Sequence, residues 1–141
     1  MNKTLLMSIH RHWLWADKIQ RTFYAALPPN LRAEETNEMF ITDWGMCMCL
    51  WYGLLFAVCE ALRAGRFTVS AVQSDIDAIY GNLKLFRNAV FHVQPKYWSP
   101  KLFSVMQDKN SAQKIKQVHD GIGSWLLTQI RQPRKASPTS A

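Results

Sequence analysis

Residues 43–60 read DWGMCMCLWYGLLFAVCE, and the sixteen residues from Trp44 to Cys59 carry no charge. A membrane span needs about 20 apolar residues, and shorter runs are more often buried core helices. The chain has 141 residues, of which 48% are hydrophobic and 12% aromatic, so it is long enough for one domain with a sizeable core. We therefore interpret this stretch as the central helix of a bundle and expect no membrane span.

Periodic apolar residues on both sides of this stretch predict three more helices. Steps of three, four or seven predict a first helix from Thr4, its candidate cap, to Leu27, where two prolines stop it. The apolar helix covers about residues 40–63 and ends near Gly65, which suits a left-handed C-terminal position.

The third helix is expected to begin near Ser70 or Ser74, either of which is a candidate N-cap, and to end before Pro95. Residues 94–110 read as a loop, and a fourth helix begins near Ser111. No alternating strand pattern appears. The sequence thus predicts an all-α, up-and-down bundle of four helices in one domain, residues 1–131, followed by a disordered, basic, Pro/Ser-rich tail at 132–141.

The net charge of +7 lies entirely in the second half of the chain. Residues 1–83 sum to −1, with an acidic connection at Glu34, Glu35 and Glu38, whereas residues 84–135 sum to +8. Such asymmetry points to a phosphate-rich ligand met by the second half, although a solvated face has the same composition.

Cysteine usage bears on compartment and on metals. Three cysteines in one apolar segment form neither a disulfide framework nor a zinc set, so we expect a reducing cytoplasm. His10 and His12 lie about 200° apart on a helix and cannot share a metal. We expect no metal and no cofactor.

The candidate site lies at the end of the third helix, in LFRNAVFH (residues 85–92). Helical geometry places Arg87 on the flank of the buried face and stacks Asn88 and His92 on the side away from the core, with Lys84 nearby. A histidine transfers protons near neutral pH and an arginine binds phosphoryl oxygens in a bidentate fork, so these residue types suit phosphodiester cleavage.

The stretch FRNAVFH resembles the Arg-x4–6-His signature of the HEPN (higher eukaryotes and prokaryotes nucleotide-binding) superfamily. The segments WYGLLFAVCEAL and FRNAVFHVQPKYWSPKLF are similar to small bacterial members, and the resemblance covers about residues 44–106. Many members are metal-independent endoribonucleases, often toxins or antiviral effectors, that work as dimers with two motifs in one cleft. The resemblance therefore implies a homodimer acting on RNA, with scope for an antitoxin or regulatory protein as a partner.

In this reading, His92 is the general acid/base, Arg87 stabilises the phosphoryl charge and Asn88 positions substrate or imidazole. Glu60 matches the family's glutamate on the second helix and is a candidate mate for Arg87, or else an exposed helix-end carboxylate. One departure is Gln94, which stands where family members regulated by adenylylation carry a tyrosine, so we do not expect that regulation.

Other residues near the motif suit RNA binding, because cations bind phosphates and aromatic rings stack on bases. They are Lys84, Lys96, Tyr97, Trp98 and Lys101. Core packing explains the two aromatic residues equally well. Two rival functions stay open at this point. One is a non-catalytic HEPN module that binds RNA, a nucleotide or a protein, and the other is a structural helical protein that docks through apolar surface.

Overall fold

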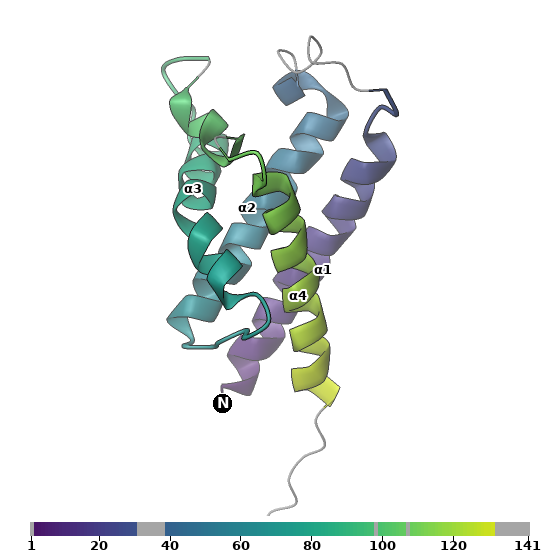
Figure 1. Cartoon of the computed structure of the whole chain (residues 1–141), viewed down its shortest axis with the longest axis vertical. Helices are drawn as coiled ribbons and strands as arrows, with labels where there is room; N and C mark the ends of the chain where they lie inside the picture. Colours follow the sequence, from purple (N-terminus) through teal and green to yellow (C-terminus); the bar gives the residue numbers. More distant parts are fainter. Residues whose placement is uncertain (1, 31–38, 98, 107, 132–141) are drawn as a thin grey trace, which may run out of the picture.

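The computed structural model is built of four long α-helices and a 3-10 helix of seven residues, η2 (Figure 1). Their bounds are α1, Lys3–Ala26; α2, Asp43–Ala64; α3, Gln73–Phe91; η2, Pro100–Met106; and α4, Ser111–Arg131. The structure describes residues 2–30, 39–97, 99–106 and 108–131. Within these ranges there is no strand, so the all-α prediction is confirmed.

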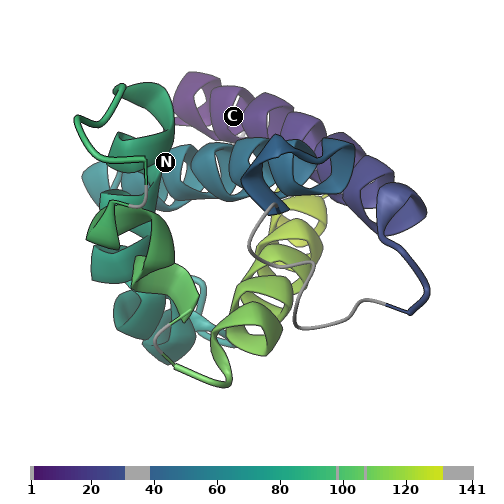
Figure 2. The same ribbon diagram turned by 90° about the horizontal axis from the view of Figure 1, so that it is seen from above.

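The four α-helices run alternately up and down, and consecutive helices pack side by side. Contacts between α1 and α4 close the arrangement, as the view along the bundle shows (Figure 2). The acidic connection at residues 34–38 and the tail at 132–141 lie outside the described residues, so the predictions for them stay untested.

Helix α2 supplies the largest share of the core. Trp51, Leu55, Phe56, Val58 and Cys59 are almost completely buried along it. Fully burying a large apolar side chain stabilises the fold by about 1.5–3 kcal/mol. The helix is long and apolar enough to cross a membrane by length and composition, but 61% of its apolar window is buried inside the bundle. It therefore packs as the predicted central helix.

The helix ends differ from the predictions in their capping residues. Asn2, not Thr4, caps α1, because its side chain accepts a hydrogen bond from the Leu5 N–H at 3.0 Å. The N-cap of α3 is Val72, which has no side-chain acceptor, so neither Ser70 nor Ser74 caps that helix. Helix α3 ends at Phe91, before Pro95 as expected.

The prediction that Gly65 adopts a left-handed conformation after α2 is also wrong. Gly65 has φ −79°, in the right-handed region, and the positive φ of 57° falls on Arg66. The turn after α2 is therefore one residue longer than a glycine cap at Gly65 requires, and it costs some backbone strain at a non-glycine residue.

The segment after α3, expected to be a loop, contains η2. The Ser104 hydroxyl donates to the Asn82 carbonyl of α3 at 2.9 Å, and the Phe103 ring stacks edge-on against Phe40 at 5.9 Å. Val105 is buried. These contacts fold the segment back over the middle of α3.

Candidate functional site

Arg87 is held in the seam between α3 and α2. Its guanidinium carbon lies 4.7 Å from the centre of the buried Phe56 ring, and Nη2 lies 3.9 Å from Glu60 Oε2. The Nε atom is buried and has no hydrogen-bond partner among the described residues. With 32% of the side chain exposed, the head group is anchored by α2 but open to a ligand on its outer side.

Glu60 lies near Arg87 and is also exposed, so each of the two alternatives stated for it holds in part. Glu60 lies in the penultimate turn of α2, and 52% of its side chain is exposed. An ion pair this long and this exposed contributes at most about 1 kcal/mol to stability. Its main effect is geometric, since Glu60 and Phe56 confine the guanidinium from two sides.

His92 lies one residue beyond α3, with an extended backbone (φ −121°, ψ 121°) and an exposed side chain. Its N–H donates to the Asn88 carbonyl at 3.0 Å, and its carbonyl accepts from the Gln94 side-chain amide at 2.7 Å. The Ser99 hydroxyl in turn donates to Gln94 Oε1 at 3.5 Å. The main chain of His92 is thus fixed at both ends, while its imidazole makes no hydrogen bond to the described residues.

The side chains of the three motif residues form no hydrogen bond or ion pair with one another within the described part of the chain. Arg87 and Asn88 lie in the last two turns of α3, and His92 follows the helix directly. Asn88 is half-buried, and its side chain has no hydrogen-bond partner there either. The three motif residues therefore share one end of α3.

The residues expected to bind RNA are at the surface wherever the structure describes them. Lys84 on α3, Lys96 and Tyr97 after it, and Lys101 in η2 are all exposed. The expectation that Tyr97 packs in the core is therefore wrong. Trp98 lies outside the described residues. Phe91 and Val93 beside His92 are also exposed, so an apolar rim adjoins the histidine.

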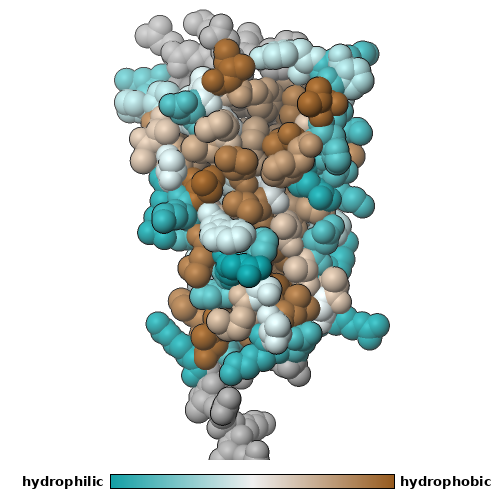
Figure 3. Space-filling view, turned by 180° about the vertical axis from the view of Figure 1, so that it is seen from behind, coloured by the Kyte–Doolittle hydropathy of each residue, from teal (hydrophilic) through white to brown (hydrophobic). Residues whose placement is uncertain are grey.

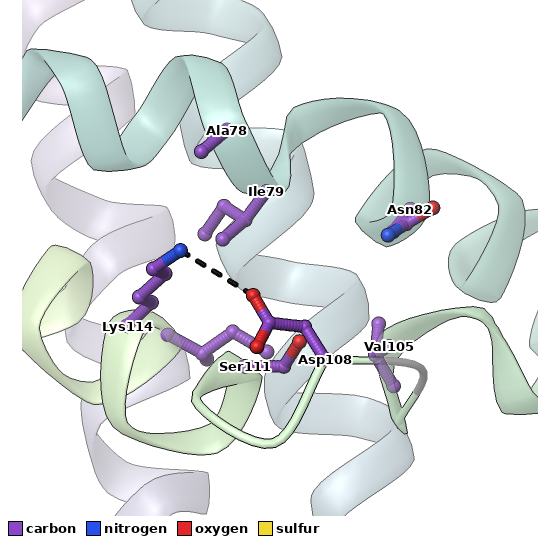
Figure 4. A pocket seen from close by; sticks show the side chains of 8 residues that line it. Ala78, Ile79, Asn82, Val105, Asp108, Ser111 and Lys114 are labelled. Carbon is purple, nitrogen blue, oxygen red and sulfur yellow. Dashed lines mark hydrogen bonds and ion pairs between the residues drawn. The ribbon is translucent and has the colours of Figure 1, made fainter.

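Within the described part of the chain, neither a metal-binding cluster nor the hollow between α3, η2 and α4 provides a ligand site. Among the described residues, no three His, Cys, Asp or Glu side chains gather where they could hold a metal ion. A hollow between α3, η2 and α4 has a volume of about 40 Å³, enough for only a few water molecules. Asp108 and Lys114 pair across it at 3.4 Å (Figure 4), and the backbone N–H of Asn110 with this lysine lowers the pKa of Asp108.

The structure also contains a buried polar network that the sequence did not reveal. His119 on α4 is completely buried, its Nδ1 accepts from Trp51 Nε1 at 3.0 Å, and its Nε2 lies 3.0 Å from Asp17 Oδ1. Because an indole nitrogen only donates, the imidazole proton lies on Nε2 and is donated to Asp17. Asp17 also accepts from Arg21 at 2.7 Å.

This network joins α1, α2 and α4 and is structural. Trp13 on α1 adds a bond from its indole to the His119 carbonyl at 2.9 Å. Both imidazole nitrogens are occupied and the ring is out of reach of solvent, so His119 cannot act as a proton acceptor for a substrate. Burial lowers the pKa of His119, against the opposing effect of its bond to Asp17. The apolar spacing of α4 would place this residue on the core face, but nothing in the sequence identifies its partners.

The chain matches no protein-family model, no curated protein and no solved structure. The resemblance of FRNAVFH and the preceding helix to HEPN proteins therefore does not place the chain in that family, and it serves only as support for a proposed function.

Proposed function

We propose that this protein is a metal-independent endoribonuclease of HEPN type, with an active site shared by two copies of the chain. The observation that carries the proposal is the end of α3, where an anchored arginine and an exposed histidine with a fixed main chain lie five residues apart. Arg87 has the charge and planar fork that bind phosphoryl oxygens, and His92 is free to transfer protons.

The reaction needs two proton-transfer groups and no metal. One imidazole takes the proton from a ribose 2′-hydroxyl, and the 2′-oxygen attacks the adjacent phosphorus. The bond from phosphorus to the 5′-oxygen then breaks, and a second imidazole, protonated, gives that oxygen its proton. The products are a 2′,3′-cyclic phosphate and a 5′-hydroxyl. Arg87 stabilises the negative charge that grows on the phosphoryl oxygens, and Asn88 hydrogen-bonds the phosphate.

Each chain supplies one His92, so both proton transfers require two chains in this scheme. The side of α2 turned away from the core provides an apolar surface beside the site: Met46 is exposed, and Leu50, Leu54 and Ala57 are half-exposed. Figure 3, which views the molecule from the side of α1 and α2, shows apolar groups gathered mainly over the upper half of this side, with hydrophilic groups at both margins and across the middle. An apolar centre with a polar rim is typical of homodimer interfaces.

The test is cleavage of a mixed RNA pool in EDTA by the wild-type protein and by His92→Ala, with His10→Ala as the matched control. His10 is a partly exposed histidine on α1 and takes no part in the proposed chemistry. We expect cleavage by the wild type and by the control and none by His92→Ala. Cleavage that survives His92→Ala would overturn the proposal. RNA binding by all three without cleavage would instead support a non-catalytic binding module.

A further inference from the structure

The outward face of α1 carries cations that are separate from the α3 site. Lys3, Arg11 and Lys18 point away from the core along this helix and are exposed. None of the three forms an ion pair with the described residues. At 1.5 Å per residue they span about 22 Å, so the face is long enough to follow several nucleotides of a chain.

No accessible carboxylate of α1 neutralises these cations. Asp17 is the single acidic residue in this helix, and its two oxygens are engaged by His119 and Arg21. The other described carboxylates belong to α2, α3, the turn before α4, and α4 itself. The first half of the chain therefore presents a cationic helix even though its formal charge sums to −1.

An aromatic ring lies among the cations. Trp15 is 49% exposed, the Arg11 guanidinium carbon lies 5.4 Å from its ring centre, and the His12 ring lies 4.8 Å from it. A shallow hollow beside it is lined by Lys3, Thr4, Met7, Ser8 and Arg11, with two hydroxyl groups between the two cations. Cations that track a backbone, together with a ring that stacks a base, are what single-stranded nucleic acid binding requires.

We propose that the outward face of α1, centred on Lys3, Arg11, Trp15 and Lys18, is a second contact surface for single-stranded RNA. It holds backbone phosphates with its three cations and stacks a base on the indole, so that a long RNA is retained by a surface other than the cleavage site. The choice of RNA as the polyanion rests on the proposed function.

A lipid surface fits this face less well. An interfacial membrane helix separates an apolar face from a cationic one and buries the apolar face in the bilayer. The apolar face of α1, with Leu6, Ile9, Ala16 and Phe23, is already buried in the bundle. The exposed Met7 and Leu14 lie between the cations and form no face of their own.

The experiment measures binding of a 5′-fluorescein-labelled 20-mer of oligouridine to His92→Ala protein, which keeps the probe intact. The test variant adds Lys3→Gln, Arg11→Gln and Lys18→Gln. The matched control adds Lys109→Gln, Lys116→Gln and Arg131→Gln, which remove the same charge from exposed positions in and before α4. We expect the α1 variant to bind about 10- to 100-fold more weakly at 0.1 M salt. The slope of the logarithm of the binding constant against the logarithm of the salt concentration should become less steep by about 2, because each phosphate contact to a single strand contributes about 0.7.

The control variant should stay within about twofold of the parent, and Trp15→Ala alone should weaken binding by about fivefold or more. Equal losses in the two triple variants, or unchanged binding by the α1 variant, would overturn the proposal. So would stronger retention on phosphatidylserine vesicles than on RNA. Cleavage by the wild-type chain is measured separately. If the wild type cleaves RNA but the α1 variant binds RNA unchanged, only the proposed α1 surface is rejected. If the α1 variant binds more weakly but the wild type does not cleave, only the proposed nuclease activity is rejected.

Discussion

Gln94 donates its side-chain amide to the backbone carbonyl of His92 across 2.7 Å, two residues away. The bond holds the chain in the extended conformation that follows α3 and leaves the imidazole outside it. Gln94 therefore fixes the main chain of His92 through its own side chain.

Removing this contact should slow catalysis without changing its proton chemistry. Gln94→Ala is expected to lower kcat for RNA cleavage about three- to tenfold, since one lost hydrogen bond amounts to about 1 kcal/mol. The pH dependence of the rate should stay the same because the imidazole is untouched. Gln113→Ala, at an exposed position of α4, is the control. A rate equal to wild type, or an altered pH profile, would show that Gln94 has a different role.

Glu60 is expected to matter for activity more than for stability. Glu60→Gln removes the charge that lies 3.9 Å from Arg87, and the pair is exposed, so the free energy of unfolding should change by less than about 1 kcal/mol. Cleavage should fall several-fold because the guanidinium loses one of its two restraints. Asp77→Asn is the matched control, because it breaks the comparable Arg63 pair at 3.5 Å. The measurements are steady-state cleavage and urea unfolding of both variants. Equal effects of the two variants on cleavage would contradict the role of Glu60 in restraining Arg87.

Gly53 leaves room for the aromatic residue that precedes His92. A Cβ at Gly53 would lie 2.6 Å from Cε2 of Phe91, so Gly53→Ala must displace that ring, which adjoins His92. We expect reduced cleavage that Phe91→Leu partly restores in the double variant. Gly81→Ala is the control: no atom lies within 4 Å of the added Cβ, and the change should stabilise α3 by about 0.4–1 kcal/mol. Additive losses in the double variant would argue against this contact.

The His119 network should make the fold sensitive to acid. Burial holds the pKa of His119 below its ordinary value of 6.5, so the unfolded chain binds the proton more readily than the folded one. Its contribution is complete above about pH 6.5–7 and is lost as the pH falls below that range. Urea unfolding from pH 8 to 5 should show this decline in the wild type and a weaker one in His119→Gln.

The same variant tests the structural role of the imidazole. His119→Gln should lower the free energy of unfolding at pH 7 by about 2 kcal/mol or more, because buried partners on α1 and α2 lose their hydrogen bonds. His10→Ala, which removes a partly exposed histidine of α1 outside the network, should leave the free energy of unfolding at pH 7 unchanged. A pH profile of His119→Gln identical to wild type would contradict the assignment.

Helical periodicity was enough to predict the four helices and most of their buried faces. The apolar run of α2 was confirmed as core, and Ile76, Ile79, Leu83 and Phe86, which recur every three or four residues along α3, are buried with it. Periodicity identifies which side of a helix is buried, but it does not identify what that side meets. The bonds of His119 to Asp17 and Trp51 connect residues 102 and 68 positions apart, and no spacing along the chain encodes them.

Local turns and short elements were predicted less well for a different reason. The seven residues of η2 are too few for a periodic pattern, and contacts with α3 and Phe40 decide their conformation. The positive φ at Arg66 goes against the usual glycine preference. At the candidate site, the nearness of Glu60 to Arg87 was expected from the resemblance of the second helix to that of HEPN proteins. The Gln94 contact depends on how the chain turns after Phe91, which the sequence pattern does not define.

The most direct test of the nuclease is the end group left on a single 5′-labelled RNA oligonucleotide after incubation in EDTA. The wild-type protein is predicted to leave a 2′,3′-cyclic phosphate, and His92→Gly is predicted to leave the RNA intact unless imidazole is added. Restored cleavage with imidazole would identify proton transfer as the role of His92. Cleavage by His92→Gly without imidazole, or intact RNA with the wild-type protein at concentrations where it is dimeric, would contradict the account.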